Sequence, residues 1–261
     1  LDMTLAMARL LAGHDRSEPE DRRFGPERVV MGLVTSLFHD AGYIRETSDH
    51  KHRNGAEFTL QHVTRSARFL ARYLPNLGMQ DWIPVATRIV HFTGYEVQFD
   101  QIQLADAADR KVGHLLGTAD LIAQMADRCY LEKCRDRLYP EFVLGGVAAP
   151  MQFSSAEAIK YSSGLDVLRQ TPAFVAGVRE QRLDGEFARA YRYVEVLFDG
   201  QNPYMEAIEQ NLAYLEMVLR GENWPLLRRN PPCFTFQAQP VEHIRHLMLG
   251  YLKGALAKPR S

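Results

Sequence analysis

His39 and Asp40 are adjacent and close an apolar run, Val29–Phe38, and this pair is the strongest indication of chemistry in the sequence. A second acidic residue, Asp120, lies far downstream in the segment GTADLIAQMADR. An imidazole and a carboxylate at the end of a buried helix are costly to desolvate unless a cation binds them. The carboxyl end of a helix also carries partial negative charge, which favours a cation there. These residues therefore predict a metal site.

The composition is that of an ordinary globular protein. The chain has 261 residues, of which 46% are hydrophobic and 24% charged, so it can bury a sizeable core. The net charge of -1 indicates no surface for a nucleic-acid polymer or an anionic membrane. The three cysteines are odd in number and show no CxxC spacing, which favours a reducing cytoplasm over a disulfide framework. No apolar stretch approaches the length of a transmembrane helix.

The elements that must position these residues are helices, and the sequence predicts an all-α fold. Periodicity and punctuation predict helices at 1–12, 26–39, 55–73, 82–92, about 105–138 and about 241–256. A break near residue 145 divides a metal-binding helical domain, residues 1–145, from a helical extension, residues 146–261, that we expect to pack on it. In the extension, Ser154 with Glu157 forms a capping box, and Thr171-Pro172 and Asn202-Pro203 each place a cap before a first-turn proline.

The motifs resemble the HD-domain superfamily of metal-dependent phosphohydrolases, which is named for its adjacent His-Asp pair. The segment FHDAGY matches the central motif, and the TADL of residues 118–121 matches the segment that often holds a later metal-binding Asp. The resemblance covers roughly residues 1–140. It implies a helical bundle in which His39, Asp40 and Asp120 hold a divalent metal.

The first residues of the chain resemble the end of a sequence signature found in the cyclic-nucleotide phosphodiesterase branch of that superfamily. Its members often carry a YHNxxHxxDV signature, whose second His is the first metal ligand. Aligning Asp2-Met3 with the final Asp-Val places both histidines before Leu1. The resemblance therefore implies that residues precede Leu1 and that a His lies two positions before it.

The resemblance also points to His62 and His91, which lie where many members of the superfamily supply further ligands. Each could bind metal, shuttle protons or be an ordinary polar residue at the margin of the core. Glu57, on the same predicted helix as His62, could orient metal-bound water or be an ordinary helical residue. Asp40 would take part in catalysis as well as in metal binding.

The substrate-binding cations are less clear in the sequence. Many members continue the His-Asp pair with Ile-Gly-Lys, whose Lys can contact phosphate, whereas this chain has Tyr43 there. Arg45, Arg65 and Lys111 lie in or beside the motif segments and could replace that charge, or could be surface cations.

The expected function is hydrolysis of a nucleotide or another small phosphoester by a metal-activated water. One or two ions are implied. Mixed nitrogen and oxygen ligands suit Mn, Fe, Co, Ni or Zn better than Mg. Two alternatives stay open: a di-iron oxygenase and a non-catalytic module that senses a ligand. The residues after Pro150 could cap the pocket, set substrate choice or form the interface of a homodimer, and these three roles also stay open.

Overall fold

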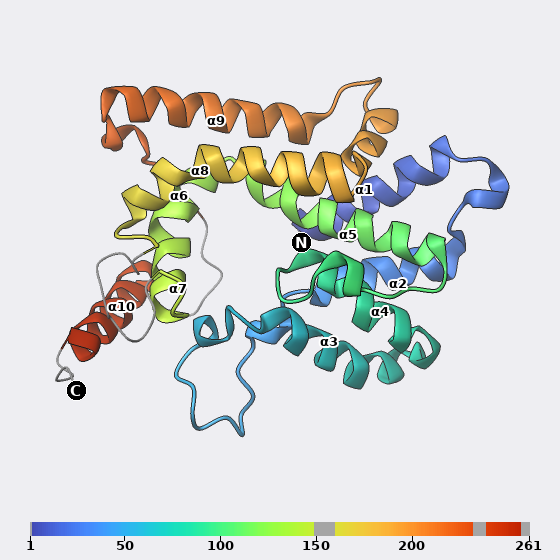
Figure 1. Cartoon of the computed structure of the whole chain (residues 1–261), viewed down its shortest axis with the longest axis horizontal. Coiled ribbons are helices and arrows are strands. Elements are labelled where there is room, and N and C mark those ends of the chain that lie inside the picture. The colour runs from blue at the N-terminus through green and yellow to red at the C-terminus, as the bar shows by residue number, and fades with distance from the viewer. Residues whose placement is uncertain (1, 149–159, 232–238, 257–261) are drawn as a thin grey trace. The chain divides into compact units, whose positions relative to one another are not determined.

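The structure, a computed structural model, describes residues 2–148, 160–231 and 239–256. Over these ranges the chain forms ten α-helices with short 3-10 and π-helical segments between them, and no strand, so the all-α prediction is confirmed (Figure 1). The helices are α1 (Asp2–Ser17), α2 (Gly25–Phe38), α3 (His62–Tyr73), α4 (Ile83–Ile89), α5 (Ala107–Met125), α6 (Tyr130–Lys133), α7 (Tyr139–Leu144), α8 (Gly164–Val178), α9 (Pro203–Gly221) and α10 (Pro240–Leu256).

Two compact units share the chain, and each is built from separate stretches of sequence. The first contains Leu1–Ile44, Gln61–Asp127 and Val175–Gln210, and the second contains Arg45–Leu60, Arg128–Phe174 and Asn211–Ser261. These units do not follow the division expected at residue 145, because the stretch Val175–Gln210 belongs with the first helices. All four residues of the predicted metal site that prove to be close together lie in the first unit.

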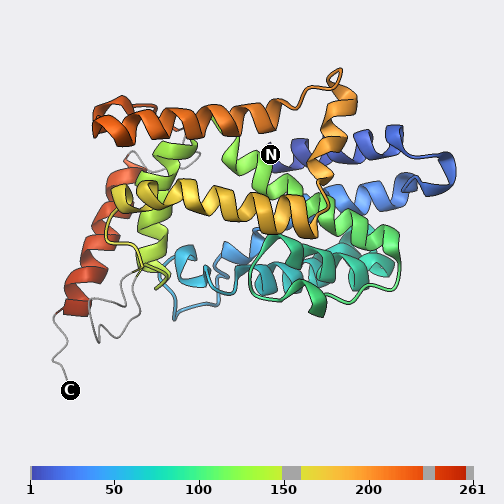
Figure 2. The ribbon, with the colours of Figure 1, turned by 45° about the horizontal axis from the view of Figure 1, so that its top comes forward.

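Helix α5 forms the centre of the first unit and packs against α1 and α2 (Figure 2). Two glycines of α5 allow aromatic rings to pack directly on its backbone. A Cβ on Gly113 would lie 2.5 Å from the Phe92 ring, and one on Gly117 would lie 2.5 Å from the Phe187 ring. Arg28 joins α2 to the start of α5 through Asp109, with an Nε–Oδ1 distance of 2.7 Å. This packing fixes the end of α2 beside the middle of α5.

The predicted helix over residues 55–73 is wrong, because the structure has a 3-10 turn, η3 (Gly55–Phe58), and then the separate helix α3. Two caps explain the division. Asn54 and Glu57 form a capping box around η3. Glu96, which is distant in sequence, accepts hydrogen bonds from the first backbone N–H groups of α3.

The predicted helix over residues 105–138 is also interrupted. α5 ends at Met125, and after a turn the chain continues as α6 and the π-helical segment η8 (Cys134–Leu138). Neither glycine nor proline occurs between α5 and α6, so no local signal marks the break.

The capping predictions in the C-terminal half have mixed outcomes. Pro203 begins α9 as predicted, with the Asn202 side chain accepting from the backbone N–H of Met205. The Thr171-Pro172 prediction is wrong, because Pro172 lies inside α8. The Thr171 hydroxyl donates to the Val167 carbonyl, a local bond that is compatible with continued helix. Ser154 and Glu157 lie outside the described residues.

In the second unit, α7 packs against η3 and α10.

Among the described residues, no helix combines the length and the apolar character that a membrane span requires.

Candidate functional site

His39 directly follows the last residue of α2, and its imidazole has a defined orientation. Nδ1 lies 2.9 Å from the Ser36 carbonyl oxygen, which can only accept, so Nδ1 donates the hydrogen bond. Nε2 lies 3.2 Å from Oδ2 of Asp40 and 3.5 Å from Oδ1 of Asp120. A carbonyl that accepts a hydrogen bond from one ring nitrogen is commonly found behind metal-binding histidines, whose other nitrogen binds the ion.

Asp40 begins the short turn η2 (Ala41–Tyr43), which packs against α3. This contact requires glycine at position 42, since a Cβ there would lie 1.8 Å from the His62 carbonyl oxygen. The Gly42 N–H also donates to the Ser66 hydroxyl at 2.8 Å. The close approach brings Oδ1 of Asp40 within 3.7 Å of Nε2 of His62.

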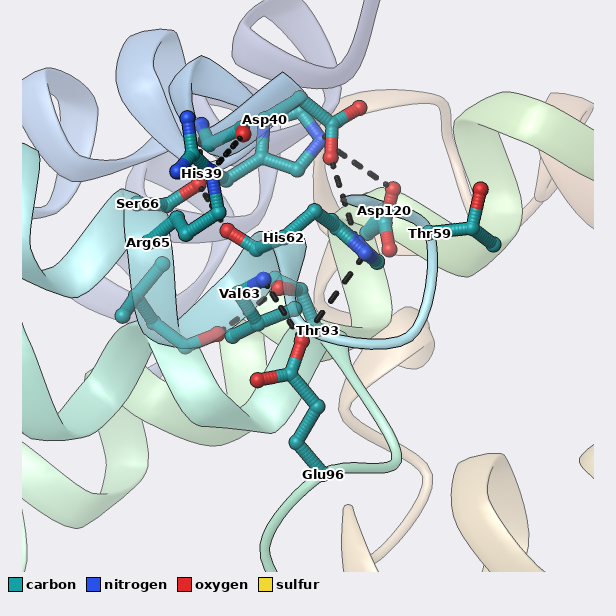
Figure 3. Close-up of polar contacts among 12 residues, drawn as sticks. His39, Asp40, Thr59, His62, Val63, Arg65, Ser66, Thr93, Glu96 and Asp120 are labelled. Carbon is teal, nitrogen blue, oxygen red and sulfur yellow. Dashed lines mark hydrogen bonds and ion pairs between the residues drawn. The ribbon is translucent and has the colours of Figure 1, made fainter. Parts of the chain in front are cut away.

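His62 is the first residue of α3 and lies between two carboxylates (Figure 3). Its Nε2 faces Asp40, and its Nδ1 lies 3.9 Å from Oε1 of Glu96, which is too long for a direct hydrogen bond. The Tyr43 ring stacks on the imidazole with centroids 4.3 Å apart. His39, Asp40, Asp120 and His62 therefore come together as the sequence predicted, from α2, η2, α5 and α3.

Glu96 is a site residue that sequence reasoning missed. Its carboxylate accepts the backbone N–H groups of Val63 at 2.7 Å and Thr64 at 2.9 Å, so it caps α3 while it flanks His62. It lies in the irregular segment TGYEVQ, where neither periodicity nor a motif marks it.

His91 lies in the 3-10 turn η6 (Val90–Thr93), near Glu96. Burial lowers the pKa of His91, and the negative charge of Glu96 only partly opposes that effect. Its Nδ1 is buried and has no hydrogen-bond partner among the described residues. Among the described residues, no hydrogen bond or ion pair joins His91 to His39, Asp40 or Asp120, so its predicted ligand role stays a prediction.

The ionisation of His39 is governed by the two aspartates. Burial alone would lower the pKa of His39, but the hydrogen bonds and charges of Asp120 and Asp40 outweigh it and raise the pKa to about 11. Burial would likewise raise the pKa of Asp40, and the pairing with His39 reverses this and lowers it. In this arrangement an imidazolium supplies the positive charge between the carboxylates.

Glu57 is engaged elsewhere. Its Oε1 accepts the backbone N–H groups of Arg53 at 2.7 Å and Asn54 at 3.1 Å, so the carboxylate serves the cap of η3 in the second unit. The structure gives Glu57 a local structural role, and its predicted role in orienting water has no supporting contact.

We call His39, Asp40, Asp120 and His62 the cluster. The three cations predicted to bind substrate do not gather at it. Arg65 donates to the carbonyls of Gly42 at 2.7 Å and Ile44 at 3.0 Å, which holds η2 on α3. Arg45 donates to the His52 carbonyl at 2.9 Å within the second unit. Lys111 precedes Asp120 on α5 by roughly 13 Å of helix axis.

Comparison with known proteins gives no relative. No protein-family model, curated protein or solved structure matches this chain. Its function must therefore be argued from the cluster itself.

The donor set suits a transition-metal ion in chemistry and in pairwise spacing. Donors at about 2.1 Å from one ion lie roughly 3.0–3.4 Å apart, and the His39 contacts to Asp40 and Asp120 are 3.2 and 3.5 Å. As the side chains stand, however, no group of three or more His, Cys, Asp or Glu residues in the described ranges could hold a metal ion. The donors are paired with one another as ion pairs, so binding would require them to turn toward a common centre.

Proposed function

We propose that this chain is a metal-dependent phosphohydrolase of the HD type that acts on a nucleotide or another small phosphoester. The observation that carries the proposal is the convergence of Nε2 of His39 with the carboxylates of Asp40 and Asp120. Two carboxylates and an imidazole, from the junction of α2 with η2 and from α5, form a mixed oxygen and nitrogen donor set. The resemblance of FHDAGY and TADL to the superfamily supports the same reading.

Each residue has a distinct part in this proposal. A divalent cation bound there would lower the pKa of a coordinated water and neutralise charge on the phosphoryl oxygens. His39, Asp40 and Asp120 would hold the ion, and Ser36 fixes the His39 ring. His62 would give or take a proton at Nε2, because that atom faces the cluster while Glu96 flanks Nδ1.

The test replaces Asp120 with Asn, which keeps the shape of the side chain and removes its charge. We expect Asp120→Asn to lose bound metal by elemental analysis and to lower turnover on a panel of nucleotides and phosphoesters by at least a hundredfold. The matched control is Asp127→Asn, which lies beyond the end of α5 and is expected to retain both. Unchanged metal content and turnover in Asp120→Asn would contradict the proposal.

A second candidate, a non-catalytic module, is favoured by the ion pairs of the cluster. The His39 side chain already pairs with both Asp40 and Asp120 without a metal. This candidate predicts that wild-type protein supplied with Mn, Fe or Zn binds none of them stoichiometrically and turns over no phosphoester. The di-iron oxygenase expected as an alternative from the sequence predicts two irons per chain and oxygen consumption in the same experiment.

A further inference from the structure

Arg182 is a buried cation that contacts Gly94 and Tyr95, the two residues before Glu96. It lies in the π-helical segment η10 (Arg179–Glu186), which continues α8, and only 7% of the residue is exposed. π-Helical segments are rare and occur frequently at functional sites. The guanidinium belongs to the same unit as the candidate site.

The hydrogen-bonding capacity of Arg182 is largely unused. Nη2 donates to the Gly94 carbonyl, while Nη1 is buried and has no hydrogen-bond partner among the described residues. None of the ion pairs within those residues includes Arg182. A buried cation without a carboxylate partner is costly, and natural proteins retain such groups mainly where they serve a purpose.

Two aromatic rings hold the guanidinium in place. Its carbon lies 3.6 Å from the centroid of Tyr95 and 4.9 Å from that of Phe99. These contacts compensate part of the buried charge. Tyr95 itself is 64% exposed, so its ring can move away from Arg182 without opening the core.

The location links Arg182 to the cluster. Gly94 and Tyr95, which Arg182 contacts, directly precede Glu96, the carboxylate beside His62. The negative charge of Asp120 contributes to the pKa of both Arg182 and Tyr95. Burial lowers the pKa of Arg182, but an arginine stays charged at neutral pH.

We propose that Arg182 binds a phosphoryl oxygen of the substrate, and that Tyr95 covers the guanidinium until the substrate displaces its ring. A guanidinium with free N–H donors is the side chain best suited to phosphate. This inference rests on the proposed phosphohydrolase function and names the residue that recognises the anionic group. The alternative is that Arg182 only braces the loop that begins at Gly94.

The experiment measures binding of inorganic phosphate and pyrophosphate by calorimetry, once in EDTA and once with Mn²⁺. Arg182→Met should weaken the affinity at least tenfold in every condition in which the wild type binds. Arg182→Lys should weaken it less, because the charge is kept and the fork of donors is lost. The matched control is Arg179→Met in the same segment, whose side chain is 46% exposed, and its affinity should stay within twofold.

Tyr95→Ala gives an independent measurement that does not remove the buried residue. It should tighten phosphate binding twofold to fivefold because the covering ring is gone. If circular dichroism shows that Arg182→Met does not fold, the phosphate affinities of Arg182→Lys and Tyr95→Ala test the proposal instead. Wild-type affinity in the folded Arg182 variants, or no binding of either anion by the wild type, would overturn the inference in favour of the loop brace.

Different results would contradict the phosphohydrolase function and the phosphate-binding role of Arg182. Arg182-dependent binding of phosphate with no turnover and no bound metal would defeat the phosphohydrolase and leave an anion site. Turnover that is unaffected by Arg182→Met, with unchanged phosphate affinity, would leave the phosphohydrolase and defeat the role of Arg182.

Discussion

Glu96 connects the stability of a helix to the chemistry of a side chain. It caps the first turn of α3 through Val63 and Thr64 and lies beside Nδ1 of His62. A carboxylate beside an imidazole restricts the orientation of the ring. If His62 serves the site, Glu96 must influence it.

Glu96→Gln should therefore lower metal affinity and turnover by about tenfold to a hundredfold, because the negative charge beside His62 is lost. Its cost in the free energy of unfolding should be about 1 kcal/mol, as for the loss of a cap. Metal titration and urea denaturation measure the two effects.

Glu57→Gln is the matched control, since Glu57 is also a capping carboxylate. It should cost a similar free energy of unfolding and leave metal affinity within twofold. Equal losses of metal affinity in both variants would show that helix capping alone accounts for the effect of Glu96, and greater loss in Glu57→Gln would restore the role first expected for that residue.

At the scale of elements, the contact between η2 and α3 sets the position of Asp40. Gly42 makes it possible, because its α-carbon faces the His62 carbonyl with no room for a methyl group. Arg65 reinforces the contact from α3 by donating to the Gly42 carbonyl. The role of Arg65 is therefore to hold two elements of the site together.

Gly42→Ala should lower the free energy of unfolding by about 1–3 kcal/mol or more, because the new methyl group must push η2 away from α3. The same shift should weaken metal binding. Gly177→Ala is the control, since nothing lies within 4 Å of a Cβ there and alanine favours the helix α8. Thermal denaturation compares the two, and equal melting temperatures would mean that η2 adapts without strain.

The helices themselves show how far sequence reasoning reaches. The α2 prediction is correct within a residue at each end, because an apolar stripe and a first-turn proline are local signals. Residues 55–73 divide because Glu96, 33 positions from Val63, caps a second helix, and no local pattern contains that fact. Pro172 lies within α8 although prolines usually open helices.

The same limit applies to the site: local sequence signals identify some of its residues, and contacts between distant residues position the others. His39 and Asp40 are adjacent in sequence, and the family resemblance pointed to Asp120 and His62. Glu96 and Arg182 gave no signal, because the contacts that position each of them join residues distant in sequence. Arg182 lies 88 positions from Gly94, whose carbonyl it binds.

At the scale of the whole molecule, His114 links folding to pH. Burial, followed by the charges of Lys111 and Arg110, lowers its pKa to about 4. Glu186 lies nearby, with Oε1 3.6 Å from Nε2 of His114. Unfolding returns the pKa to about 6.5, so between these values the unfolded chain binds a proton that the folded chain does not. The free energy of unfolding must fall as the pH falls through that window.

His114→Gln should remove this dependence. Between pH 7 and pH 4 we expect the wild type to lose about 1–2 kcal/mol more than the variant, after allowing for solvent screening. Urea denaturation across the pH range measures the difference. His243→Gln, at an exposed position of α10, should follow the wild type, and parallel curves for all three proteins would contradict the assignment.

The cap that Glu96 places on α3 also makes the site observable without substrate or metal. The Val63 and Thr64 amides can exchange with deuterium only when their hydrogen bonds to Glu96 open. Such an opening would separate Glu96 from His62 while leaving His39 at the end of α2. The exchange rates of two backbone amides thus report how often Glu96 leaves α3 and the His62 ring in the native protein.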